Sequence, residues 1–343
     1  MIEDELLARI IGISEGNYLN VIFNEMTITD WYEIGGKASL WSNGFHYCDN
    51  KAAKEIIKSE RLRFTNVKDL DDKTEFYNIM DIINKCLQEG DFKSEFRDYI
   101  LKSEQFISLL NGEPFYIGRT VKNQDYHKIY YKTYTCSLSY TENSEYMWKE
   151  YAKDPDGIAI HFSDISDMFV GTNSNGITER NRFEDGMKLS RGIVFYDDEY
   201  KRKCTETLLN EVFVLYTEAI RHYIDYLPQI QNAFVCAINN MRSFFKINEE
   251  KYKKETEYRY SISFPFEKEG EIKNTLIDYN KVSDTEKDQI DIKFKKNKIV
   301  ELWVNPSCGN EYINIQSEMS DLLDTYGYIG VEVIDSAKSR LEV

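Results

Sequence analysis

The chain has 343 residues, of which 42% are hydrophobic and 30% are charged, with 17 Gly and 5 Pro. This composition excludes a collagen-like or disordered chain, and the length allows one elaborated domain or two small ones. The 59 acidic side chains outnumber the 43 basic ones and give a formal charge of −16, which disfavours binding to nucleic acid or to an anionic membrane through bulk charge.

Neither membrane insertion nor secretion is indicated by the sequence. No stretch approaches the roughly 18 consecutive apolar residues of a membrane helix, and the acidic residues 3–5 are unlike the start of a secretory signal. The six cysteines are widely scattered and form no C-x-x-C pair, which is typical of free thiols in a reducing compartment. We therefore expect a cytoplasmic protein with no membrane partner.

Residues 1–40 are expected to form an N-terminal extension, with a helical apolar pattern near its start and a flexible joint at Gly35-Gly36. Residues 41–343 are expected to form one domain. In its first half we expect a strand at 40–47, a helix at 51–59 capped by Asp49 or Asn50, a strand at 62–65, helices over 76–110 broken near Gly90, a strand at 130–139, a helix at 144–152 and a strand at 158–162.

The second half begins with a polar loop at 171–186 and is expected to contain a long helical segment. The expected elements are a strand at 187–196, two helices over 199–245 that break near Pro228, strands at 257–263, 275–279 and 292–304, a helix at 315–325 and a strand at 328–334. The fold class is therefore α+β, with a mixed and mostly antiparallel central sheet and helical insertions near 76–112 and 199–248.

Several familiar catalytic motifs are absent. The chain contains no G-x-x-x-x-G-K-[ST], G-x-G-x-x-G or H-E-x-x-H. The nearest approach to a phosphate-binding loop, at 171–176, is followed by Ile177 where a lysine is required. Classical nucleotide triphosphatases, Rossmann oxidoreductases and zincins thus lose their usual sequence evidence.

One of the four histidines stands out. His46 ends a predicted strand, is followed by Tyr47 and precedes a capped helix, so its ring is expected at a sheet edge where ligands commonly bind. A zinc site with Cys48 lacks a second pair of ligands, and no metal is expected. His161 lies in an apolar strand, where a hydrogen-bonded core histidine is the favoured interpretation.

Two acidic segments are candidate sites. Asp71 and Asp72 lie at a loop-to-helix junction, where one of them either binds a metal or a ribose hydroxyl or simply caps the helix. Further along, Glu255, Glu257 and Arg259 are spaced two apart and share one face of a strand. Such a face is usually solvated, but in a cleft it is a carboxylate pair beside a fixed cation.

A short helix after the predicted strand at 130–139 carries Trp148 and Tyr151, three residues apart and therefore on one face. We expect both aromatic side chains to pack against that strand.

Five groups of motifs follow one another along the chain: F-H-Y and L-R-F-T (45–65), D-L-D-D-K-T-E (69–75), S-L-S with W-K-E-Y-A and G-I-A-I-H-F (137–162), E-T-E-Y-R (255–259), and I-V-E-L-W-V-N-P with Y-I-G-V-E-V-I-D-S (299–336). This ordered set resembles that of a large bacterial family known mainly as a domain of unknown function and found near phage-defence genes. The resemblance spans nearly all of residues 41–343.

The layout is also distantly similar to the mono-ADP-ribosyltransferase core, which implies NAD as substrate. In that core the first motif holds the nicotinamide ribose, a Ser-x-Ser element braces the nicotinamide pocket, and the Glu of an E-x-E element stabilises the oxocarbenium-like transition state. The resemblance implies that His46, Ser137 with Ser139, and Glu257 with its partner Glu255 fill these roles. We also expect Tyr47, Asp72 and Arg259 to contact NAD. The usual Ser-Thr-Ser is replaced here by Ser137-Leu138-Ser139.

Three functions remain open from the sequence. The first is an NAD-consuming enzyme, which transfers ADP-ribose to a protein or nucleic-acid acceptor or hydrolyses NAD, as a phage-defence or toxin-like effector. The second is a non-catalytic nucleotide-sensing or protein-interaction module. The third is a metal-dependent nuclease built from Asp71, Asp72, Glu75 and Glu257.

Overall fold

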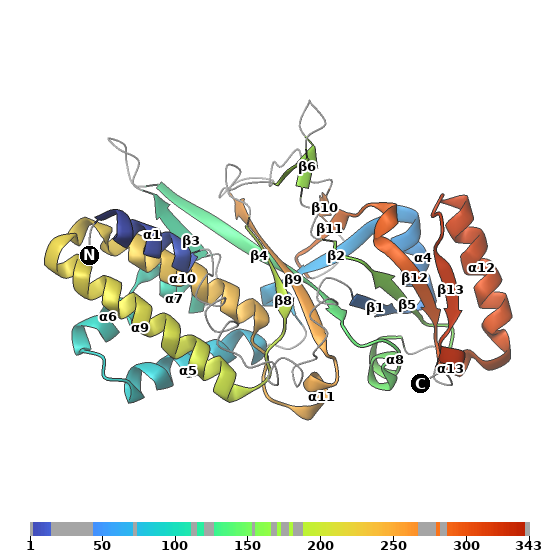
Figure 1. Cartoon of the computed structure of the whole chain (residues 1–343), viewed down its shortest axis with the longest axis horizontal. Helices are drawn as coiled ribbons and strands as arrows, with labels where there is room; N and C mark the ends of the chain where they lie inside the picture. The colour runs from blue at the N-terminus through green and yellow to red at the C-terminus, as the bar shows by residue number, and fades with distance from the viewer. Residues whose placement is uncertain are drawn as a thin grey trace.

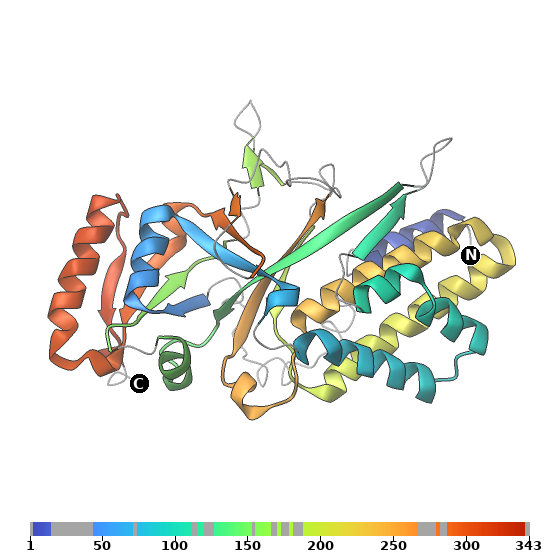
Figure 2. The ribbon, with the colours of Figure 1, turned by 180° about the vertical axis from the view of Figure 1, so that it is seen from behind.

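Figure 1 shows the computed structural model, in which a twisted sheet occupies the middle and helices gather at both ends. One long helical group lies beside the N-terminus, and a smaller group lies beside the C-terminus. Figure 2 shows the same arrangement from behind. The structure describes residues 3–14, 44–70, 74–110, 115–119, 127–152, 155–165, 170–172, 178–180, 188–266, 279–281 and 287–339.

The central sheet has 11 strands and is mostly antiparallel. Its main order is β10-β11-β2-β4-β1-β5-β12-β13, while β3 and β9 also pair with β4, and β8 pairs with β9. Among the described strands, only β12 and β13 pair in parallel. The strands are β1 (Gly44–Cys48), β2 (Arg61–Asn66), β3 (Phe115–Arg119), β4 (His127–Ser139), β5 (Ile158–Phe162), β8 (Lys188–Ile193), β9 (Glu257–Phe266), β10 (Tyr279–Lys281), β11 (Gln289–Lys293), β12 (Ile299–Val304) and β13 (Glu332–Asp335), with a separate pair β6 (Val170–Thr172) and β7 (Thr178–Arg180).

The helices confirm the expected α+β class, and many of them lie in two insertions between strands. The first insertion lies between β2 and β3, and the second between β8 and β9. The helices are α1 (Glu3–Ser14), α4 (Asn50–Ser59), α5 (Thr74–Glu89), α6 (Ser94–Leu101), α7 (Glu104–Leu110), α8 (Glu145–Tyr151), α9 (Asp198–His222), α10 (Leu227–Phe244), α11 (Glu250–Lys253), α12 (Tyr312–Thr325) and α13 (Ser336–Ser339).

Helix ends follow the local sequence signals. The Asp49 carboxylate accepts a hydrogen bond from the Ala52 amide over 2.7 Å, which confirms the expected cap of α4. Ser144 caps α8 in the same way. Helices α9 and α10 are separated by a short 3₁₀ turn at Ile224–Tyr226, and Pro228 lies in the first turn of α10, where its missing amide costs no helical hydrogen bond.

One expected strand proves to be two. The segment predicted as a single strand over 292–304 divides into β11, which pairs with β2, and β12, which pairs with β5. A 3₁₀ turn at Lys296–Lys298 separates them. The run of lysines and asparagine at 295–298 interrupts the apolar pattern, and the two halves belong to different parts of the sheet. The predicted strand at 275–279 lies mostly outside the described residues.

The first helix is part of the helical group rather than separate from it. Leu6, Ile10 and Ile13 of α1 are buried in the main core, and α1 packs on α10 and α9. Arg9 pairs with Glu211 of α9 at 2.6 Å. The remainder of the expected N-terminal extension, residues 15–40, lies outside the described residues.

A second, smaller core covers the other face of β1. Trp148 packs edge-on to Tyr47, with ring centroids 4.9 Å apart, and belongs to this core with Phe45 and Trp303. The expectation that Trp148 and Tyr151 both pack on β4 is therefore wrong. Helix α8 turns Trp148 onto β1, while Tyr151 remains 47% exposed.

The remaining side-chain expectations concern histidine and cysteine. His161 Nδ1 lies 3.1 Å from Glu301 Oε2 and its ring stacks on Phe45, which confirms a hydrogen-bonded core histidine. All six cysteines are free and buried. Within the described ranges, no helix has the length and apolar composition needed to cross a membrane.

Candidate functional site

Strand β4 lies between β1 and β9 and brings together three of the sequence motifs. Ser139 is opposite Phe45 of β1 on one side and opposite Glu257 of β9 on the other. Ser137 is opposite Arg259 of β9. Because neighbouring strands lie about 4.8 Å apart, β1 and β9 are separated by roughly 10 Å across β4. The backbone therefore places the His46, Ser-x-Ser and E-x-E elements beside one another.

Four buried charged side chains meet where β9 begins: Lys246, Glu255, Glu257 and Arg259, called the buried charge cluster below. None of them is more than 6% exposed. Lys246 Nζ lies 2.6 Å from Glu255 Oε2 and 3.3 Å from Glu257 Oε2. The interpretation of Glu255, Glu257 and Arg259 as a solvated strand face is therefore wrong, because burial and ion pairing hold all three together.

The two carboxylate oxygens of Glu257 have different surroundings. Oε1 accepts hydrogen bonds from the Ser137 hydroxyl and from Arg259 Nε, the latter over 2.7 Å. Oε2 accepts only the longer contact from Lys246 at 3.3 Å. Arg259 is itself fixed, because it also donates to the Ser243 carbonyl over 2.9 Å. Glu257 is thus held rigidly through one oxygen, while the other is less strongly engaged.

Glu255 connects the buried charge cluster with helix α8. Its Oε2 accepts from Lys246, and its Oε1 accepts a hydrogen bond from the Tyr151 hydroxyl over 2.9 Å. Tyr151 is about half exposed, whereas Glu255 is buried. Tyr151 therefore extends from the protein surface to a buried carboxylate.

The two glutamates ionise differently. Burial alone would raise the pKa of Glu257, but the charges of Arg259 and Lys246 and the hydrogen bond from Ser137 lower it to about 2. Burial raises the pKa of Glu255 above its ordinary value, and Lys246 opposes this only in part. One carboxylate is thus kept ionised, while its neighbour takes up a proton more readily.

Contacts from the second helical insertion position Lys246. The Lys246 amide donates to the Phe195 carbonyl over 3.0 Å, and Phe195 and Phe245 form an isolated parallel bridge. The fully buried Lys201 of α9 donates to the Lys246 carbonyl over 2.8 Å. The ammonium group lies 4.6 Å from the centre of the Tyr252 ring. The lysine is therefore held from both its backbone and its side chain.

His46 points to the other face of the sheet from Glu257. Phe45, Ser139 and Glu257 are opposite one another across β1, β4 and β9, so their side chains share one face, and the neighbouring His46 side chain points to the other. Burial lowers the pKa of His46, and a hydrogen bond with the backbone of Ser137 partly offsets this effect. The sheet therefore separates the His46 ring from the buried charge cluster.

Tyr47 lies elsewhere. Its hydroxyl donates to the Thr141 carbonyl over 3.2 Å and accepts from the Ser144 amide over 3.1 Å, and burial raises its pKa to about 12. Adjacent residues of a strand point to opposite faces, so Tyr47 belongs to the smaller core with Trp148 while His46 faces away from it. The structure does not bring Tyr47 to the buried charge cluster.

The structure thus brings together most of the residues singled out in the sequence, namely Ser137, Ser139, Glu255, Glu257 and Arg259, whereas His46 points to the other face of the sheet. Asp72 lies outside the described residues. Sequence reasoning missed Lys246, Tyr151 as a partner of Glu255, and Tyr196. The Tyr196 hydroxyl is buried with no hydrogen-bond partner in the described part of the chain, and burial followed by the charge of Glu257 raises its pKa.

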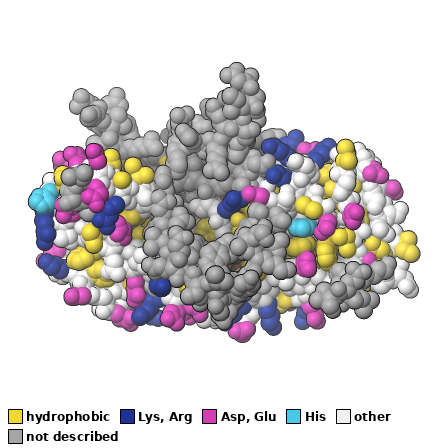
Figure 3. All heavy atoms as spheres, in the orientation of Figure 1, with side chains coloured by type: hydrophobic (Ala, Val, Ile, Leu, Met, Phe, Trp, Pro, Cys, Tyr) yellow, Lys and Arg dark blue, Asp and Glu magenta, His cyan; other side chains and the backbone are white. Residues whose placement is uncertain are grey.

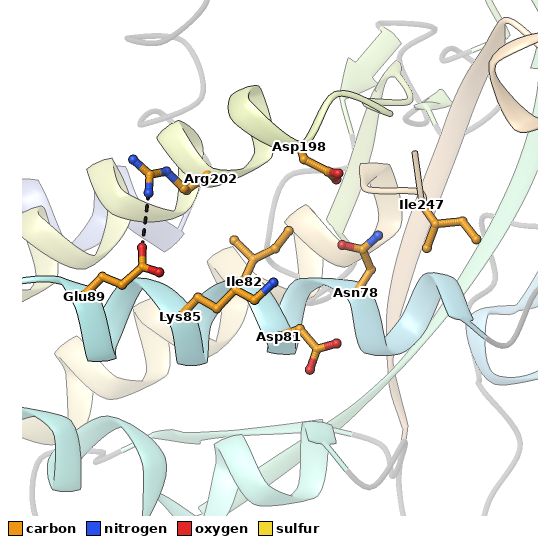
Figure 4. Close-up of a pocket in the computed structure, with 8 residues that line it drawn as sticks. All are labelled: Asn78, Asp81, Ile82, Lys85, Glu89, Asp198, Arg202 and Ile247. Atoms are coloured by element: carbon orange, nitrogen blue, oxygen red, sulfur yellow. Dashed lines mark hydrogen bonds and ion pairs between the residues drawn. The ribbon is translucent and has the colours of Figure 1, made fainter. Parts of the chain in front are cut away.

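A cavity of about 510 Å³ lies between α5 and α9, with polar and apolar lining residues (Figure 4). Its wall includes Asp198, which pairs with Lys201 at 2.6 Å, and Ile247, the residue after Lys246. Arg202 on this wall pairs with Glu89. The cavity therefore adjoins the segment that supports the buried charge cluster, but it does not contain the two glutamates.

The nuclease alternative requires a group of metal-binding side chains. No group of three side chains suited to a metal ion occurs in the ranges that the structure describes. Asp71, Asp72 and the side chain of Glu75 lie outside what the structure describes. Acidic and basic side chains are interspersed over the described part of the face drawn in Figure 3.

Comparison with known proteins gives one match. Residues 147–260 match the model of a family described as "Protein of unknown function (DUF2971)". No curated protein and no solved structure matches the chain. The matched segment runs from α8 into β9 and includes Tyr151 and all four members of the buried charge cluster. Over about a third of its length, the chain is therefore similar to a family of unknown function, and the charged residues of the candidate site lie in that part.

Proposed function

We propose that the protein is an NAD-consuming enzyme that breaks the bond between nicotinamide and ribose at the buried charge cluster. ADP-ribose then passes to a protein or nucleic-acid acceptor or to water. The observation that carries the proposal is that the Ser137 hydroxyl donates a hydrogen bond to Glu257 within the buried charge cluster. These residues come from the Ser-x-Ser and E-x-E elements, which the mono-ADP-ribosyltransferase resemblance assigns to one NAD site.

The charges of the site suit this reaction. When the C–N bond breaks, its electron pair leaves with nicotinamide and positive charge develops on the ribose, which a fixed carboxylate stabilises. Glu257 is ionised at neutral pH, and its Oε2 is the less engaged oxygen. The incoming water or acceptor must lose a proton, and the raised pKa of Glu255 suits it to accept one.

The position of Lys246 determines how strongly the negative charge of Glu257 acts on the ribose. Two carboxylates and two cations make the buried charge cluster neutral overall, so a ribose cation next to Glu257 would also be repelled by nearby positive charge. Lys246 lies closer to Glu255 than to Glu257, at 2.6 Å against 3.3 Å. A shift of Lys246 further toward Glu255 would expose the negative charge of Glu257 to the substrate.

The setting of this activity follows from the family resemblance. We place it in the cytoplasm, as the effector of a phage-defence or toxin-like system. The second candidate is a non-catalytic nucleotide-sensing or protein-interaction module. It is favoured by one observation: each carboxylate oxygen of Glu255 and Glu257 already accepts a hydrogen bond from within the protein, as in a structural ion-pair network.

Incubation of the purified protein with NAD distinguishes these candidates. An enzyme releases nicotinamide, and a candidate acceptor gains mass when ADP-ribose is transferred to it. A sensing module binds NAD or another nucleotide without releasing nicotinamide, which calorimetry detects. If the protein neither releases nicotinamide nor binds NAD, then NAD is not its substrate or ligand.

A further inference from the structure

Thr256, between the two buried glutamates, has a backbone conformation that threonine rarely adopts. Its φ is +44°, in the left-handed region. The other non-glycine residues with positive φ in the described ranges are Glu60 and Asn143, so Thr256 is the one β-branched residue among them. A branched Cβ makes this conformation costly, and such strain persists only where the surrounding structure enforces it.

Contacts on both sides of Thr256 enforce the conformation. Its amide donates to the Lys253 carbonyl over 3.2 Å, and its carbonyl accepts from the Tyr140 amide over 2.8 Å. Its hydroxyl lies 2.8 Å from the hydroxyl of Ser139, the second serine of the Ser-x-Ser element. Glycine is the usual residue at a left-handed position after a helical turn, but glycine has no hydroxyl to make this last contact.

The left-handed residue sets where the two carboxylates point. Glu255 ends the turn that follows α11, with its amide bonded to the Tyr252 carbonyl, and Glu257 begins β9. Thr256 joins the turn to β9 with a positive φ, and both carboxylates reach the one ammonium of Lys246. In any other backbone conformation of Thr256, the Glu255 side chain would point in a different direction relative to Glu257.

We propose that Thr256 is a positioning residue, and that its hydroxyl contact with Ser139 locks the left-handed turn that brings Glu255 and Glu257 together on Lys246. The contact also ties the Ser-x-Ser strand to the E-x-E strand. Its consequence for catalysis rests on the proposed function, whereas its consequence for the placement of Glu255 does not.

The test compares three substitutions of Thr256. Thr256→Val keeps the branched shape but loses the hydroxyl, Thr256→Ser keeps the hydroxyl, and Thr256→Gly loses the hydroxyl but adopts positive φ without strain. In protein labelled with ¹³C at glutamate carboxyls, the valine variant should shift the titration of Glu255 toward that of an exposed glutamate. The serine and glycine variants should keep the wild-type titration. The signal is assigned by its loss in Glu255→Gln.

A double substitution tests the contact itself. Ser139→Ala should shift the Glu255 titration in the wild-type background, but should leave it unchanged in the Thr256→Gly background, where no lock is needed. A matched control is available at the other end of the same strand pair. Thr133 of β4 and Ser263 of β9 also have hydroxyls 2.8 Å apart, and Ser263→Ala should leave the Glu255 titration unchanged.

Activity provides the second measurement. Misplacement of a reacting group by about 1 Å costs roughly a hundredfold in rate, so Thr256→Val should lower kcat for nicotinamide release by about that factor while KM for NAD changes less than about twofold. The fall in kcat should be much smaller for Thr256→Gly than for Thr256→Val. If the valine and glycine variants give the same titration and rate, or if Ser139→Ala does not shift the titration, the proposed lock is wrong. If the wild type releases no nicotinamide, the proposed function fails, while the titration still tests the lock.

Discussion

The Ser137 hydroxyl donates a hydrogen bond to Glu257 Oε1, so one contact joins two motifs that are 120 residues apart in the chain. Arg259 Nε donates to the same oxygen over 2.7 Å. The candidate site therefore links the Ser-x-Ser and E-x-E elements through one serine of the central strand. This arrangement leads to specific expectations for the residues on either side of it.

Glu257→Gln should separate catalysis from binding. The substitution preserves shape but removes the anion, so NAD turnover should fall by about a hundredfold or more while NAD affinity changes little. It also leaves Lys246 and Arg259 buried with less compensating charge, so the free energy of unfolding should fall by about 3 kcal/mol. Nicotinamide release and chemical denaturation measure the two effects. Glu250→Gln, on the exposed side chain paired with Lys253, is the control and should change neither.

Acid should destabilise the wild type through Glu257. The pKa of Glu257 is lowered from 4.5 to about 2 in the folded protein, so its stabilising contribution is complete above pH 4.5 and is lost as pH falls toward 2. At about 1.4 kcal/mol per pKa unit, the contribution is about 3 kcal/mol. Denaturation measured at several pH values between 5 and about 2.5 should therefore show a steeper loss for the wild type than for Glu257→Gln. Parallel curves would contradict the ion pairing of Glu257.

Tyr151→Phe should raise the pKa of Glu255. Burial already raises this pKa, and the hydrogen bond from Tyr151 opposes the effect by stabilising the ionised form. Without the hydroxyl, Glu255 should lose its proton at higher pH, and the acidic limb of the rate profile should move upward with it. Carboxyl NMR measures the titration directly. Tyr146→Phe on the same helix is the control, because the described residues give its hydroxyl no hydrogen-bond partner.

His46→Ala should leave NAD binding unchanged. The resemblance implies that His46 holds the ribose, but its ring points to the other face of the sheet from Glu257. Calorimetric titration with NAD checks the binding, and nicotinamide release checks the rate. His222→Ala, at the exposed end of α9, is the control and should affect neither. Weaker NAD affinity in His46→Ala than in His222→Ala would show that His46 does contribute to the NAD site.

Local patterns in the sequence predicted most of the fold and part of the site. Alternating and branched residues identified β4, and side chains that bond to nearby amides identified the caps Asp49 and Ser144. Strand periodicity placed Glu257 and Arg259 on one face. These signals succeed because each depends only on residues within a few positions of one another.

The missing parts of the site depend on long-range packing. Lys246 reaches the glutamates because β8 and the end of α10 meet at the Phe195–Phe245 bridge, and no local pattern encodes that meeting. Trp148 and Tyr151 share a helix face by spacing, yet the tilt of α8 sends Trp148 to β1 and Tyr151 to Glu255. Burial of the charged strand face likewise depends on the helical insertion that covers it.

The most direct test of the central claim is the release of nicotinamide when the wild-type protein is incubated with NAD, with and without a metal chelator. The account predicts release in both conditions, at equal rates, because the reaction is assigned to Glu257 and Glu255. Release abolished by the chelator would instead favour metal-dependent chemistry. No release in either condition, together with no detectable NAD binding, would contradict the proposed enzyme.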